Sequence, residues 1–89
     1  MTITGQVFIG GRFRPSAETT PVLEAATGQP LGDGANAGTV DVDAAVAAAR
    51  AALPAWSATS AQDRAAGPGA MAAALKSRAA TTAELVTRE

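Results

Sequence analysis

The sequence predicts an α+β fragment in which an N-terminal β-hairpin and a short strand are followed by two or three alanine-rich helices. Two observations support this fold class. Short apolar runs separated by glycine occupy residues 1–38, and such runs are typical of strands and tight turns. From residue 39 onward alanine dominates and apolar residues recur every three or four positions, as in amphipathic helices. We therefore divide residues 1–89 into a hairpin and strand region, 1–38, and a helical region, 39–89.

The hairpin is expected around the dipeptide Gly10-Gly11. Val7-Phe8-Ile9 precedes it and Arg12-Phe13-Arg14 follows it. Glycine readily adopts the positive φ that a type I′ turn requires at both central positions. After a polar, turn-like segment at residues 15–20, Val22-Leu23 begins a further extended stretch. Residues 32–38 are expected to form a glycine-rich loop.

The first helix is expected to open near Thr39, because Asp41 and Asp43 in its first turn favour the positive end of the helix dipole. Pro54 disfavours helical geometry at the residue before it, so this helix should end at about Leu53. One face of the helix is apolar; it comprises Val42, Val46, Ala49 and Leu53. Trp56 follows as an expected core anchor.

A second helix is expected to begin at Thr59-Ser60, where either hydroxyl can cap the helix and Gln62 or Asp63 lies three residues on, as in a capping box. Gly67-Pro68-Gly69 combines two poor helix formers with a residue that lacks an N–H. The sequence therefore predicts a kink or break within residues 66–69, with a separate helix over residues 70–88.

Composition excludes most catalytic classes. The chain has no cysteine and no histidine, so it lacks a thiolate nucleophile, soft metal ligands and the usual general base near pH 7. Of its apolar residues 24 are alanine, so a stable independent core is not expected. The net charge of −1 and the scattered cations argue against nucleic acid as a partner. No apolar run approaches the length of a membrane span, and we expect a cytoplasmic location.

Several motifs have a functional and a structural interpretation. Residues 32–37 match the dinucleotide pattern G-x-G-x-x-A, but no buried strand precedes them, so we interpret them as a plain loop. Asp41 and Asp43 lie two apart and point to different sides of a helix, so dipole compensation and solvation account for them. Lys76 is interpreted as an exposed lysine and Ser57 and Ser60 as capping residues, because nothing in the chain activates them.

The order of these motifs resembles the start of NAD(P)-dependent aldehyde dehydrogenases. That family pattern has an apolar-Ile-Asn/Gly-Gly hairpin, an Asn-Pro-Ala-Thr-Gly turn, an Asp-Val-Asp-x-Ala-Val-x-Ala-Ala helix, an Ala-Phe-x-x-Trp segment and a helix ending Leu-Ile-Thr-x-Glu. The corresponding residues here are Phe8-Ile9-Gly10-Gly11, Ala25-Ala26-Thr27-Gly28, Asp41-Val42-Asp43-Ala44-Ala45-Val46-Ala47-Ala48-Ala49, Ala52-Leu53-Pro54-Ala55-Trp56, Arg64 and Leu85-Val86-Thr87-Arg88-Glu89. Three departures stand out: Glu24-Ala25 replaces Asn-Pro, Gly34 replaces a usual strand residue, and Gly67-Pro68-Gly69 replaces a leucine-rich helix turn.

The resemblance implies that the chain is a partial N-terminal coenzyme-binding domain, the outer part of an α/β aldehyde dehydrogenase, truncated before the catalytic cysteine and the cofactor-binding region. We therefore expect no catalytic, cofactor-binding or metal-binding residue within it and no activity of the chain alone. NAD or NADP is implied for a full-length parent that oxidises aldehydes to carboxylic acids. The expected partners are the remainder of such an enzyme or a second copy joined through exposed apolar helix faces, with no nucleic acid and no membrane. The alternative is a small stand-alone helical module that binds a protein through Val42, Val46, Leu53 and Trp56.

Overall fold

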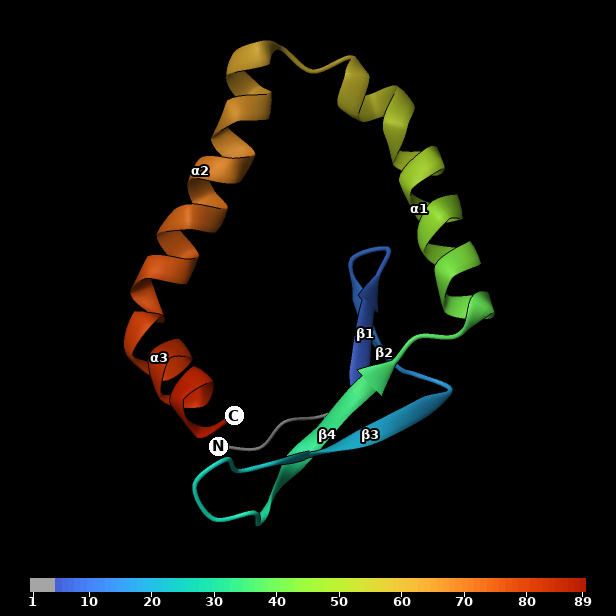
Figure 1. Cartoon of the computed structure of the whole chain (residues 1–89). Helices are drawn as coiled ribbons and strands as arrows, with labels where there is room; N and C mark the ends of the chain where they lie inside the picture. The colour runs from blue at the N-terminus through green and yellow to red at the C-terminus, as the bar shows by residue number, and fades with distance from the viewer. Residues whose placement is uncertain (1–4) are drawn as a thin grey trace.

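The computed structural model describes residues 5–89 and places the strands before the helices (Figure 1). This order confirms the predicted α+β class. The elements are β1 (Gln6–Ile9), β2 (Arg12–Pro15), β3 (Glu18–Leu23), β4 (Pro30–Asn36), α1 (Thr39–Ser57), α2 (Ala61–Ser77) and α3 (Ala79–Arg88). The strands form two separate antiparallel pairs, β1 with β2 and β3 with β4.

The first hairpin forms as its sequence predicts. Gly10 and Gly11 connect β1 to β2 with φ of 62° and 80°, the positive values that a type I′ turn needs at both positions. Phe8 lies opposite Phe13 across the pair, and their ring centroids are 4.8 Å apart. This cross-strand aromatic contact fixes the register of the hairpin.

The second strand pair is longer than the sequence indicated. Residues up to Asn36 belong to β4, so the prediction of a loop over residues 32–38 is wrong for most of that segment. The polar segment 15–20 is likewise mostly strand, since β2 ends at Pro15 and β3 starts at Glu18. Glycine weakens a strand but does not prevent pairing. Here Gly34 pairs with Thr20 across the sheet. Because Thr20 lies 14 positions earlier in the chain, the composition around Gly34 does not indicate this pairing.

Helix α1 begins at Thr39 as predicted but does not end at Leu53. It continues through Pro54 to Ser57, so the predicted end point is wrong. A proline removes one hydrogen bond from the helix, and its ring clashes with the preceding turn. The turn after it is closed by its own bonds, because the Ser57 hydroxyl and the Ala58 N–H both donate to the Pro54 carbonyl.

Helix α2 runs unbroken through residues 66–69, so the predicted break and the separate helix beginning at residue 70 are wrong. Its N-terminus is stabilised by Ser60, whose hydroxyl accepts a hydrogen bond from the Asp63 N–H at 3.1 Å. Alanine, the best helix former, supplies most residues on both sides of Pro68. The helical path is interrupted instead at Arg78, which separates α2 from α3.

Little of the surface is covered. The solvent-accessible area is 6733 Å², whereas a compact monomer of this mass exposes about 4,800 Å². The Cα radius of gyration is 16.5 Å, against about 12 Å for a compact domain of this length. Helix α1 leads away from the strands, and α2 and α3 return toward the β3–β4 turn, so the elements enclose an open space (Figure 1). Among the described apolar residues, Leu31 alone is classed as buried.

Pro68→Ala should stabilise α2, because alanine restores the missing donor and removes the clash with the preceding turn. The expected gain is about 3 kcal/mol of helix stability. The matched control is Gly69→Ala, for which about 1 kcal/mol is expected. Far-UV circular dichroism during urea unfolding measures both changes. A gain from Pro68→Ala no larger than that from Gly69→Ala would contradict an unbroken α2.

Candidate functional site

The N-terminus of α1 holds the most buried charged group of residues 5–89. Asp41 is only 8% exposed. Its Oδ2 accepts a hydrogen bond from the Gly38 N–H at 3.1 Å, and Nη2 of Arg14 lies 3.7 Å from its Oδ1. The position of Asp41 in the first turn of α1 fits the expected interaction with the helix dipole. The prediction that Asp41 is solvated is wrong. Asp43 is exposed, as predicted.

This helix N-terminus does not fit the pyrophosphate of NAD or NADP. Phosphate binding at a helix N-terminus uses free backbone N–H groups and positive dipole charge. At α1 the Gly38 N–H is already bonded to Asp41, whose carboxylate adds negative charge where a phosphate would lie. The pattern G-x-G-x-x-A also fails to lead directly into the helix, because its glycines lie within β4 and pair with β3. The N-terminus of α1 therefore offers no cradle for a pyrophosphate.

The hairpin turn packs against a face of α1 made of small side chains. A Cβ built on Gly10 would lie 3.8 Å from the Cβ of Ala48, so the two elements approach closely. The groove between them is open and almost entirely apolar. It is lined by Phe8, Ile9, Gly10, Gly11, Ala45, Ala48, Ala49, Ala51 and Ala52. Such a surface accommodates apolar side chains and offers no reactive group.

The large apolar side chains of α1 are uncovered. Val42, Val46 and Leu53 are between 46% and 59% exposed. Trp56 is 49% exposed and belongs to the last turn of α1, beside Gly67 of α2, so the prediction that it anchors a core is wrong. We call these four residues the α1 apolar face. Contiguous apolar surface of this kind is typical of an interaction surface.

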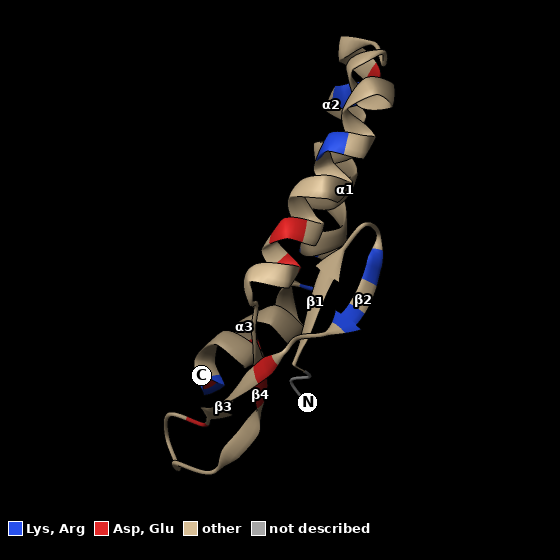
Figure 2. Cartoon of the chain, turned by 90° about the vertical axis from the view of Figure 1, so that its right-hand side faces the viewer, with Lys and Arg blue, Asp and Glu red and all other residues tan. Residues whose placement is uncertain are grey.

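The remaining candidate residues have structural surroundings. Ser60 caps α2 as predicted, whereas Ser57 donates its hydroxyl hydrogen to the carbonyl oxygen of Pro54 at 3.1 Å. Lys76 is exposed, as predicted. Within residues 5–89 there is no group of three or more acidic, histidine or cysteine residues arranged to hold a metal ion, and no helix is apolar over a length that would cross a bilayer. Basic and acidic residues are spread over strands and helices (Figure 2).

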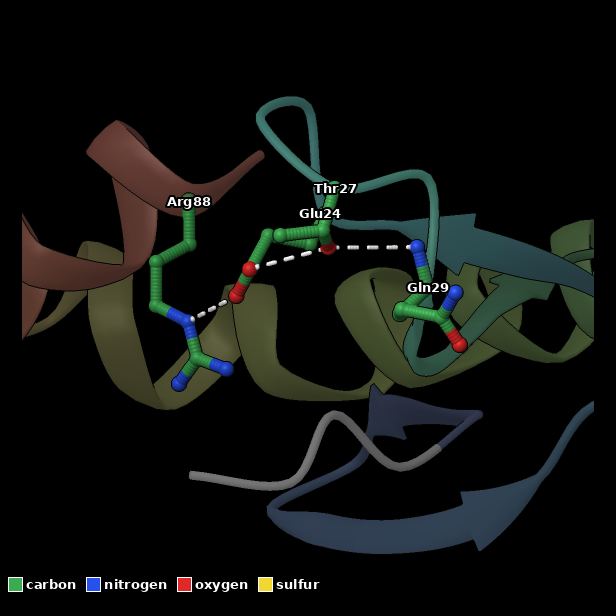
Figure 3. A network of polar contacts seen from close by, with 4 residues as sticks. All are labelled: Glu24, Thr27, Gln29 and Arg88. Carbon is green, nitrogen blue, oxygen red and sulfur yellow. Dashed lines mark hydrogen bonds and ion pairs between the residues drawn. The ribbon is translucent and has the colours of Figure 1, made fainter.

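Sequence reasoning missed a polar network that joins the β3–β4 turn to the end of α3. Glu24 of the turn binds Arg88 of α3, and within the turn the Thr27 hydroxyl donates to Glu24 and the Gln29 N–H donates to Thr27 (Figure 3). Nε of Arg88 lies 2.7 Å from Oε2 of Glu24. The hydrogen bonds from Arg88 and then Thr27 hold the pKa of the Glu24 carboxyl below its ordinary value. The partners are 64 residues apart, so no spacing rule reveals them.

Comparison with known proteins gives one consistent result. The profile of the aldehyde dehydrogenase family matches residues 13–89. The 2-aminomuconic semialdehyde dehydrogenase of Bos taurus is 42% identical over 57 residues, which cover 64% of this chain and 12% of that protein. The mitochondrial succinate-semialdehyde dehydrogenase of Mus musculus is 39% identical over 62 residues, 70% of this chain and 12% of that protein. The alignments thus span about 12% of the length of these relatives.

Asp41→Asn should weaken the start of α1, because the neutral amide loses both the charge-assisted bond to Gly38 and the attraction of Arg14. The expected loss is about 1 kcal/mol in the free energy of unfolding. Asp43→Asn is the matched control, since Asp43 is exposed, and should change stability by less than about 0.5 kcal/mol. Urea titration followed by circular dichroism compares the two. Equal effects would show that Asp41 is no more than a surface charge.

Proposed function

This chain belongs to the aldehyde dehydrogenase family, and we propose that it supplies the outer layer of the coenzyme-binding domain of an NAD(P)-dependent enzyme that oxidises aldehydes to carboxylic acids. The observation that carries the proposal is the family match over residues 13–89. Both relatives are semialdehyde dehydrogenases, which supports a semialdehyde as the first substrate to test.

The proposed reaction converts an aldehyde, water and NAD(P)⁺ into a carboxylic acid, NAD(P)H and a proton. The dinucleotide accepts the hydride when it is bound. Covalent acyl transfer in this family requires a thiolate, and this chain contains no cysteine. The chemistry therefore depends on residues outside this chain, and the role proposed for residues 5–89 is structural.

The uncovered surface supports that role. The α1 apolar face and the groove beside the hairpin turn expose side chains that a complete domain would bury. Burial of apolar area contributes roughly 25 cal/mol per Å², so covering these residues would add to the stability of the chain. The match to an enzyme family does not favour the alternative, a stand-alone helical module.

The 89-residue chain alone should show neither aldehyde oxidation nor ester hydrolysis, because it has no thiolate. Its affinity for NAD and NADP should be too weak for isothermal calorimetry to detect at micromolar concentrations. Aldehyde oxidation is measured as the increase in NADH absorbance with succinate semialdehyde as substrate. Turnover that persists through rigorous purification would contradict the proposal, as would a micromolar dissociation constant.

Complementation tests the positive half of the proposal. The chain should restore activity to the Mus musculus succinate-semialdehyde dehydrogenase from which the aligned 62 residues have been removed. Val46→Asp should abolish this rescue, because it places a charge on the α1 apolar face. Glu84→Gln on α3, where the carboxylate is exposed, is the matched control and should rescue fully. Rescue by Val46→Asp as strong as by the unaltered chain would contradict docking through α1.

A further inference from the structure

The contact between Arg88 and the β3–β4 turn involves both residues at which that turn departs from the family pattern. The pattern has Asn-Pro where this chain has Glu24-Ala25. Glu24 provides the carboxylate that binds the Arg88 side chain, and the Ala25 N–H donates to the Arg88 carbonyl at 2.8 Å. Proline has no N–H and could not form the second bond. The two departures therefore serve a single contact.

We propose that Glu24, Ala25 and Arg88 form a clasp, a conformational device that ties the end of α3 to the β3–β4 turn and closes the strands and helices into a ring. The clasp can open without loss of the turn, because the hydrogen bonds within residues 24–29 do not involve Arg88. The clasp is independent of the proposed enzymatic role.

Hydrogen bonds within the β3–β4 turn orient the Glu24 carboxylate. The Glu24 N–H donates to the Gln29 carbonyl and the Gly28 N–H donates to the Glu24 carbonyl, both at 2.8 Å. The Thr27 hydroxyl donates to Oε1 of Glu24 at 3.0 Å, which leaves Oε2 directed at Arg88 (Figure 3). The Glu24 side chain is 22% exposed and that of Arg88 is 34% exposed. Both carboxylate oxygens are thus engaged in a partly shielded site.

The clasp determines whether the ring stays closed, because few other contacts hold α2 and α3 in place. The elements that pack extensively against one another within residues 5–89 are β3 with β4, β1 with β2, α1 with β1 and β1 with β4. Neither α2 nor α3 belongs to this set. At its far end α2 follows α1 through the short connection at residues 58–60. Release of Arg88 would therefore free α2 and α3 to move away from the strands.

Restoring the family residues tests the clasp directly. The chain is free of cysteine, so Ala26→Cys and Thr81→Cys, both at exposed positions, give a unique pair of spin labels in the full 89-residue chain. Glu24→Asn with Ala25→Pro should shift the distance distribution to longer and broader values. Arg88→Gln should do the same. Glu84→Gln and Arg78→Gln, which remove one charge of each sign at exposed positions, are matched controls and should leave the distribution unchanged.

A second measurement reports on the contact between Glu24 and Arg88 itself. In nuclear magnetic resonance titration, the Glu24 carboxyl should titrate below its ordinary value of 4.5 in the unaltered chain and return toward that value in Arg88→Gln. The only charged side chain paired with Glu24 among the described residues is Arg88. Since the pKa of the closed state is lowered, the stabilisation that the Glu24 carboxylate gives to the closed state should be fully present above the ordinary value of 4.5 and should be lost as pH falls through the lowered pKa.

Each result decides the proposal. Lengthened distances in the Glu24→Asn, Ala25→Pro chain together with a lowered Glu24 pKa in the unaltered chain would support it. Unchanged distances in that variant would overturn it. An ordinary Glu24 pKa in the unaltered chain would overturn it as well, because Arg88 would then not be bound. The exchanged pair Glu24→Arg with Arg88→Glu should recover the short distances at least partly.

Discussion

A shortage of large apolar side chains constrains the whole structure. Alanine accounts for 24 residues of this 89-residue chain, and an alanine side chain has little surface to bury. Leu31 is therefore alone among the described apolar residues in being classed as buried. Without a core, the elements owe their form to local interactions: the positive-φ turn at Gly10-Gly11, the cap at Ser60, and backbone hydrogen bonds within helices and strand pairs. Long-range order then depends on a few contacts, of which the one between Glu24 and Arg88 spans the greatest distance along the chain.

The features that the sequence predicts well are those with local causes. Two glycines between apolar runs determine the hairpin turn, and Ser60 with Asp63 determines the start of α2. Predictions that treated proline as a helix terminator were wrong at Pro54 and Pro68. Each proline carries a cost of about 3 kcal/mol, but a break would also sacrifice the hydrogen bonds of the alanine-rich turns on both sides. A rule that counts only the cost of the proline, and not the helix hydrogen bonds that a break would lose, therefore predicts breaks where the helix continues.

The features that the sequence does not reveal depend on distant partners. β4 is a strand despite its glycines because β3 lies beside it. Asp41 is buried because Arg14, which lies 27 positions earlier, approaches its carboxylate. Arg88 reads as an ordinary last-turn cation, and only the folded chain places it against Glu24. The resemblance to a family located the unusual residues Glu24 and Ala25, but it could not show that they act together.

The start of α1 illustrates how one residue can serve stability and exclude a ligand at the same site. A helix N-terminus attracts an anion because its first N–H groups are unpaired and its dipole is positive there. In this chain the anion is Asp41, a part of the helix itself, held within 3.1 Å of the Gly38 N–H and close to Arg14. A phosphate placed there would have to displace the carboxylate or lie beside its charge. The residue that stabilises α1 therefore also disfavours a second anion at this helix N-terminus. Under the proposed function, the exposed apolar side chains of α1 are the surface through which this chain would contribute to a larger enzyme.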